Sequence, residues 1–232
     1  MLKKFCGWLL FKCLGWKLNV TVDLPEKFII ALAPHTSNWD FILGELYMHS
    51  QGLKINFLMK KEWFKGPLKP LFLKMGGIPV YRSKHTSLTD NLAGEASKRD
   101  AFKLCIPPEG TRSLNPEWKR GFYFIAMKAN IPVLLYGVDY ERKLIECTKS
   151  FIPSGDVDNE MRMVKHYFKD FKGKYPEKFT IGEVCLSDTA AYHRQYAICQ
   201  PIPGLVGRHR LSGRPMGNQR LFASGSFEWT PR

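Results

Sequence analysis

Short apolar runs alternate along the chain with segments in which apolar residues recur at helical spacing. A short apolar run that ends at Pro, Gly or a polar turn is typical of a buried strand, whereas a three-to-four-residue spacing predicts an amphipathic helix. The expected strands span residues 28–33, 55–59, 78–81, 102–106, 133–138 and 144–152, and the expected helices span 39–50, 68–75, 87–99, 121–129 and 156–171. This alternation predicts an α/β fold, a mostly parallel mixed sheet flanked by helices.

The two ends of the chain differ from this α/β region. Residues 1–16 combine flanking lysines with Trp and Phe, which favours an N-terminal amphipathic helix that lies in a membrane interface, packs on the domain, or does both. As a helix, 5–16 would be about 18 Å long against roughly 30 Å of hydrocarbon, too short to span a bilayer. Residues 181–232 hold Arg, Gly and Pro but no lysine and no regular period. We therefore expect an interfacial helix (1–16), a folded domain (17–180) and a poorly ordered tail (181–232).

Composition narrows the class of partner. The 232 residues are 44% hydrophobic and 13% aromatic, which excludes a largely disordered or collagen-like chain. A formal net charge of +14 predicts an anionic partner: nucleic acid, an anionic membrane surface or a phosphorylated substrate. Lysines and aromatic residues interleave over 54–74, which favours a membrane interface, with a solvated basic face over packed rings as the alternative. The six cysteines form no C-x-x-C pair and no zinc-finger spacing, so we interpret them as reduced cytosolic thiols and expect no metal site.

Three loops after predicted strands carry chemically useful side chains. His35 follows the 28–33 strand, and Asp40 lies five residues further on, so the carboxylate can fold back to orient the imidazole of a general base. Arg82 ends a second strand. The third loop places Glu109, Gly110, Thr111 and Arg112 in one tight turn, with the Gly110 amide expected to be open to a ligand. Because parallel strands end at one edge of a sheet, these loops should converge, and two arginines beside a glycine turn can hold a phosphate.

The order of these motifs resembles that of the 1-acylglycerol-3-phosphate acyltransferases, the bacterial glycerolipid acyltransferase family, in a short form. His35 and Asp40 match its H-x4-D motif. Gly-Ile-Pro-Val-Tyr-Arg at 77–82, Pro-Glu-Gly-Thr-Arg-Ser at 108–113 and Ile-Pro-Val-Leu-Leu at 131–135 match its next three blocks in order. The resemblance covers roughly residues 1–180.

What the resemblance implies is a glycerolipid acyltransferase-like fold and a single-step transfer. A fatty acyl group would move from acyl-CoA or acyl-carrier protein to the hydroxyl of 1-acylglycerol-3-phosphate, glycerol phosphate or a related lysolipid in phospholipid biosynthesis. The donor would be a co-substrate, and no cofactor is implied. The family match implies that His35 and Asp40 form the catalytic dyad and that Lys60, or equally Lys61, stabilises the oxyanion. It also implies an acceptor pocket formed by Arg82, Glu109, Gly110, Thr111 and Arg112.

Other functions remain open on the sequence. A nucleic-acid-binding module would suit the basic charge, but no nucleic-acid-binding motif is present, so we expect no nucleic acid partner. A non-catalytic lipid-binding relative is disfavoured by the intact His and Asp, and a thioesterase by the two arginines suited to a phosphate. The expected location is the cytoplasmic face of the inner membrane, where the protein would bind peripherally to anionic lipid.

Overall fold

The computed structural model describes residues 1–80 and 85–182, and for 85–87 the backbone only. These residues belong to one compact unit, Met1–Val184. Its centre is a seven-stranded sheet in the order β1-β7-β6-β2-β5-β3-β4. The strands are β1 (Lys17–Val20), β2 (Lys27–Ala33), β3 (Asn56–Lys60), β4 (Gly77–Val80), β5 (Phe102–Ile106), β6 (Val133–Asp139) and β7 (Leu144–Phe151). Neighbouring strands are parallel except β6 and β7, which are antiparallel, so the predicted α/β class with a mostly parallel mixed sheet is confirmed.

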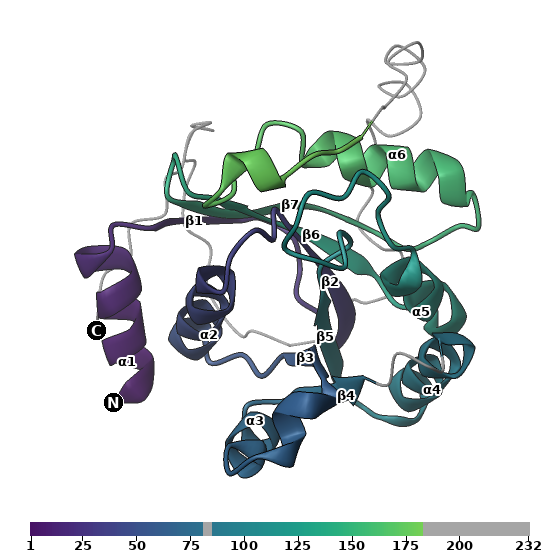
Figure 1. Cartoon of the computed structure of the whole chain (residues 1–232), viewed down its shortest axis with the longest axis horizontal. Coiled ribbons are helices and arrows are strands. Elements are labelled where there is room, and N and C mark those ends of the chain that lie inside the picture. The colour runs from purple at the N-terminus through teal and green to yellow at the C-terminus, as the bar shows by residue number, and fades with distance from the viewer. Residues whose placement is uncertain (81–84, 183–232) are drawn as a thin grey trace, which may run out of the picture. The chain divides into compact units, whose positions relative to one another are not determined.

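Helices flank this sheet (Figure 1). They are α1 (Leu2–Gly7), α2 (Trp39–Gln51), α3 (Lys69–Lys74), α4 (His85–Lys98), α5 (Gly121–Ala129) and α6 (Val157–Tyr167), with a π-helical turn η1 (Trp8–Cys13) and 3-10 turns η2 (Lys61–Lys65) and η3 (Pro176–Lys178). Helix α1 packs on α2, α5 packs on β2 and β6, and α4 packs on α5. None of the helices in the described part of the chain is long and apolar enough to cross a membrane.

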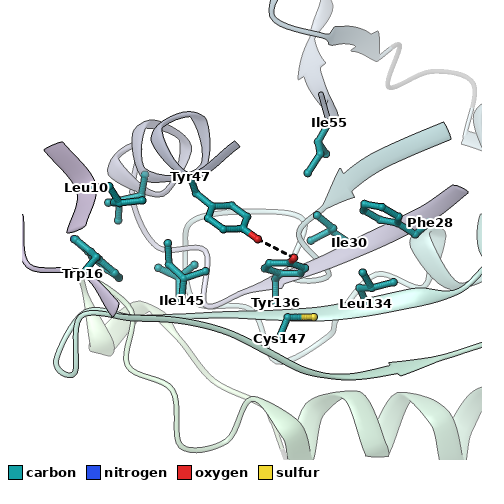
Figure 2. Packing of buried hydrophobic residues seen from close by; sticks show 12 residues of the cluster. Leu10, Trp16, Phe28, Ile30, Tyr47, Ile55, Leu134, Tyr136, Ile145 and Cys147 are labelled. Atoms are coloured by element: carbon teal, nitrogen blue, oxygen red, sulfur yellow. Dashed lines mark hydrogen bonds between the residues drawn. The ribbon is translucent and has the colours of Figure 1, made fainter. Parts of the chain in front are cut away.

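Strand β6, an interior strand between β7 and β2, shows how the two faces of the sheet are covered. All seven of its residues are buried, as expected for a strand covered on both faces. Leu134 and Tyr136 point into the cluster beneath α2, where the Tyr136 hydroxyl hydrogen-bonds that of Tyr47 at 3.0 Å (Figure 2). On the opposite face a side chain at Gly137 would lie 2.0 Å from the ring of Phe171, so only glycine fits there. The sheet is therefore covered on both faces at β6.

The N-terminal segment is helical from residue 2 to 13 and lies against the domain. Cys6, Leu10 and Trp16 are buried, with Leu10 and Trp16 in the cluster under α2. The opposite face exposes Leu2 and Phe5 and, beyond them, Trp8. Packing on the domain and an exposed apolar face thus occur together in this segment.

Several boundaries differ from the sequence-based expectation. Strand β1 was not predicted, because it has only four residues and pairs with β7 from a distant part of the chain. The last helix was expected to reach residue 171 but ends at Tyr167; Phe168 and Phe171 are buried beyond it, so burial rather than helical spacing explains their apolar character. Residues 81–84 and the predicted tail from residue 183 onward lie outside the described residues.

Parallel strands bring the candidate chemistry to one edge. Strands β2, β3, β4, β5 and β6 all run in the same direction, so their carboxyl ends share an edge of the sheet. The loops that leave this edge hold the H-x4-D motif, Lys60, the turn after β5 and the β6–β7 connection. In open α/β sheets this is the edge at which ligands bind.

Candidate active site

The H-x4-D motif forms the turn between β2 and α2. The chain leaves β2 at Ala33, and Asp40 lies in the first turn of α2. The Nδ1 atom of His35 is 3.2 Å from Oδ2 of Asp40. The Asp40 side chain is fully buried, whereas that of His35 is 20% exposed, so only the histidine of the pair can reach a substrate.

Three donors hold the Asp40 carboxylate. Oδ2 accepts hydrogen bonds from the backbone N–H groups of Thr36 and Ser37, each at 2.9 Å. Oδ1 accepts one from the Tyr140 hydroxyl at 2.7 Å. Among the described residues His35 Nδ1 has no well-directed hydrogen bond, so its approach to Asp40 is close but not aligned. Catalytic hydrogen bonds are often loose before substrate binds and tighten in the complex.

Glu109 joins the turn after β5 to this motif. Both of its carboxylate oxygens accept from the backbone N–H of His35, at 3.1 and 2.9 Å. The residue is 4% exposed, and this burial raises the pKa of Glu109 to about 8; the His35 amide opposes that rise and the charge of Asp40 adds to it. In this structure Glu109 positions His35, and its predicted part in holding the acceptor stays a prediction.

The turn that follows Glu109 is exposed and borders the same opening. Gly110 has a φ of +68°, a conformation that favours glycine. Its N–H was expected to be open to a ligand, but it donates to the Pro107 carbonyl at 3.1 Å, so that expectation was wrong. The Thr111 hydroxyl accepts from the Ser113 N–H at 3.2 Å. The exposed Arg112 guanidinium is thus the cation that this turn offers to an anionic ligand.

Three further residues were predicted for the site from the sequence: Lys60, Lys61 and Arg82. Lys60 is the last residue of β3, is exposed and borders the same cavity as His35. Lys61 begins η2. Arg82 follows β4 and lies outside the described residues.

A cavity of about 870 Å³ opens at this edge and continues beneath α2. His35, Asp40, Lys60 and Arg112 border it, and most of the remaining wall is apolar. Its inner part is formed by residues of the core cluster, among them the hydrogen-bonded pair Tyr47 and Tyr136 (Figure 2). A volume of this size is within the usual range for small-molecule sites. The dyad is therefore at the mouth of a hollow that can hold an apolar chain.

The structure also shows a residue that the sequence analysis missed. Tyr140 follows β6 and is one hundred residues from Asp40 in the chain. Its ring packs edge-on against Trp16 at a centroid distance of 5.1 Å, and its N–H donates to the Lys172 carbonyl at 2.8 Å. It belongs to none of the four sequence motifs, so no local signal could have connected it to Asp40.

The segment after α6 supports the same turn. The Tyr175 N–H donates to the Thr36 hydroxyl at 3.2 Å. Gly173 lies so close that a side-chain carbon there would be 2.7 Å from that hydroxyl oxygen. Within the described residues no group of three or more His, Cys, Asp or Glu side chains could hold a metal ion.

Comparison with known proteins identifies the family of this chain. The sequence model of the Acyltransferase family matches residues 18–136, more than half of the chain. The protein belongs to the Acyltransferase family and is therefore an acyltransferase. Among solved structures, that of the 1-acyl-sn-glycerophosphate (LPA) acyltransferase PlsC from Thermotoga maritima is similar, with a TM-score of 0.49 and 19% identity over 72% of this chain and 75% of that chain. No curated protein matches the sequence.

Proposed function

We propose that the protein transfers a fatty acyl group from acyl-CoA or acyl-carrier protein to the hydroxyl of 1-acylglycerol-3-phosphate or a related lysolipid, in phospholipid biosynthesis. The observation that carries the proposal is the His35–Asp40 pair at the mouth of a largely apolar cavity of about 870 Å³. The family supplies the reaction class, the cavity offers room for an acyl chain, and the histidine offers a base beside it.

In the proposed reaction Nε2 of His35 takes the proton of the acceptor hydroxyl, because Nδ1 faces Asp40. The acceptor oxygen bonds to the thioester carbonyl carbon, and the tetrahedral intermediate collapses with loss of the C–S bond. The thiolate then takes the proton from His35, so the step balances without a further cofactor. Asp40 stabilises the imidazolium, and Lys60 faces the developing oxyanion from the end of β3.

The acceptor phosphate is proposed to bind beside the exposed turn that follows β5. Arg112 is exposed at the cavity mouth and can bind a phosphate with two parallel hydrogen bonds. Arg82, Gly110 and Thr111 are kept in this pocket on the strength of the family motifs. Glu109 is kept in the acceptor pocket on the same ground, and its carboxylate also accepts from the His35 backbone N–H.

The test uses one acyl-CoA with a panel of lysolipids and identifies the products by mass spectrometry. The expected product is the diacylated phospholipid, and His35→Ala should lower its formation by roughly 10²- to 10⁴-fold, the usual contribution of a general base. Asp40→Asn should also impair transfer. Free fatty acid without an acylated acceptor would identify a thioesterase instead, and near-normal turnover by folded His35→Ala would refute the mechanism.

We also propose that the protein binds the cytoplasmic face of the inner membrane peripherally. Exposed apolar side chains occur on α1, at the start of α2 and along η2 and α3, the last among lysines. Apolar burial and attraction of lysines to anionic lipid act together at an interface. The exposed apolar side chains of these elements, with that of Trp8 in η1, are Leu2, Phe5, Trp8, Trp39, Ile42, Trp63, Leu68, Leu71 and Leu73.

Sedimentation with vesicles tests this location. Binding should increase with anionic lipid and decrease partly with salt, with an apolar remainder at high salt. The double variant Phe5→Ser, Trp8→Ser should lose most of that remainder, because both side chains are more than half exposed. Ile152→Ser, which changes an exposed apolar residue after β7, is the control and should bind as the parent does. Equal sedimentation of all three proteins would exclude α1 and Trp8 as a membrane contact.

A further inference from the structure

Helix α2 carries a carboxyl group into the wall of the apolar cavity. Glu45 borders this cavity together with Phe41, Leu43 and Met48 of the same helix. Its side chain is 13% exposed. One of its oxygens, Oε2, is 3.6 Å from Nε2 of His49, one turn further along α2. The other, Oε1, is buried and has no hydrogen-bond partner among the described residues.

Three other buried polar side chains of the cavity have hydrogen-bond partners, unlike Oε1 of Glu45. The hydroxyls of Tyr47 and Tyr136 bond to each other, and Asp40 accepts from three donors. Buried polar atoms in folded proteins are nearly always hydrogen-bonded, since an unpaired one destabilises the fold. Burial also raises the pKa of Glu45 to about 7, so near neutral pH the group is a mixture of acid and carboxylate. It can then both donate and accept.

The position of Glu45 relates it to the part of a substrate that enters the cavity. Glu45 comes five residues after Asp40 on one helix, a rise of about 7.5 Å along the axis. The reacting carbonyl would be beside His35, and the chain attached to it would extend along the cavity wall that Glu45 borders. A saturated hydrocarbon chain would leave Oε1 unpaired, whereas a hydroxyl on the chain would satisfy it.

We propose that Glu45 is a specificity site for a hydroxyl group on the acyl chain, so that hydroxyacyl donors are preferred over unsubstituted donors of equal length. This inference rests on the proposed function, because it places the donor's acyl chain in the cavity under α2. A site that hydrogen-bonds a substrate hydroxyl discriminates against the analogue that lacks it, since its own polar group is then left unpaired.

The experiment compares tetradecanoyl-CoA with tetradecanoyl-CoA hydroxylated at carbon 3 or further along the chain. The wild type should use at least one hydroxylated donor about tenfold or more better in kcat/KM. Glu45→Leu should lose this preference and raise the Tm, because it removes the unpaired carboxyl. Glu45→Gln should retain most of the preference, since an amide also donates and accepts. Tyr167→Phe, which removes a hydroxyl outside the cavity, is the control and should keep it.

A binding measurement separates this inference from the proposed reaction. Calorimetry needs no turnover. It compares plain tetradecanoic acid with the acids that carry one hydroxyl at carbon 3 or at a carbon further along the chain. Tighter binding of a hydroxylated acid by the wild type but not by Glu45→Leu supports the site even if no lysolipid is acylated. Equal affinities and equal kcat/KM values for plain and hydroxylated chains in the wild type, or a preference unchanged in Glu45→Leu, would overturn it.

Discussion

Tyr140→Phe tests whether the third donor to Asp40 matters for the dyad. The change removes one oxygen atom and leaves the ring, which packs on Trp16, in place. Burial, and next the hydrogen bond to Asp40, raise the pKa of Tyr140, so its hydroxyl stays protonated and donates over the working pH range. The variant therefore leaves Oδ1 of a fully buried carboxylate without its donor.

The magnitude follows from the number and kind of bonds lost. A hydrogen bond to a charged group contributes about 1.5–3 kcal/mol to stability. A domain of this size should then lose roughly 3–12 °C in Tm, at about 2–4 °C per kcal/mol. Two backbone amides still hold Oδ2, so Asp40 stays close to its place. We expect kcat to fall about tenfold, well short of the loss in His35→Ala.

The assay is thermal unfolding together with steady-state acyl transfer. Tyr167→Phe is the matched control, because the Tyr167 hydroxyl hydrogen-bonds Thr148 at 3.2 Å rather than Asp40. It should lower the Tm slightly and leave kcat unchanged. If Tyr140→Phe keeps both the parental Tm and the parental kcat, the argument that this tyrosine positions Asp40 is refuted.

Two further predictions concern the neighbours of His35. Folding raises the pKa of Glu109 from 4.5 to about 8. Between these two values the folded state holds a proton that the unfolded state has released. The free energy of unfolding should therefore fall as pH rises from about 5 to 8. The fall attributable to Glu109 is up to about 5 kcal/mol, and Glu109→Gln should flatten it in denaturant titrations; an unchanged slope would contradict the assignment. Gly173→Ala should lower acyl transfer and destabilise by about 1–3 kcal/mol, because its new carbon would lie 2.7 Å from Thr36 Oγ1. Gly94→Ala, with open space around it, is the control, and equal behaviour of the two would count against the close packing.

Much of the α/β order could be predicted because its elements have strong local patterns. The runs that form β2, β5 and β6 are apolar and end at Pro or polar turns, and α2 and α5 have clear helical spacing. The family was also predicted from ordered motifs and is confirmed by the match over residues 18–136. Strand β1 was not predicted, because four residues at a sheet edge show little periodicity.

In the candidate site, too, the local features were predictable from the sequence and the long-range contacts were not. The spacing of His35 and Asp40 is a local property of the chain, and the structure brings their side chains to 3.2 Å. The bond from Glu109 to the His35 amide and that from the Tyr140 hydroxyl to Asp40 are not local, whereas the bond from the Gly110 amide to the Pro107 carbonyl lies within a single turn. They depend on which strand ends are neighbours and on how each loop turns.

Residue order and apolar spacing alone therefore determined the fold class, the family and the identity of the candidate base. These features repeat over a few residues or occur as short motifs, so they can be recognised in the sequence alone. Only the tertiary structure decided what surrounds the base: the Tyr140 hydroxyl on Asp40, a buried Glu109 behind His35 and the unpaired Oε1 of Glu45 in an apolar wall. Burial and hydrogen-bond pairing arise when distant segments pack together, and no local pattern in the chain encodes them.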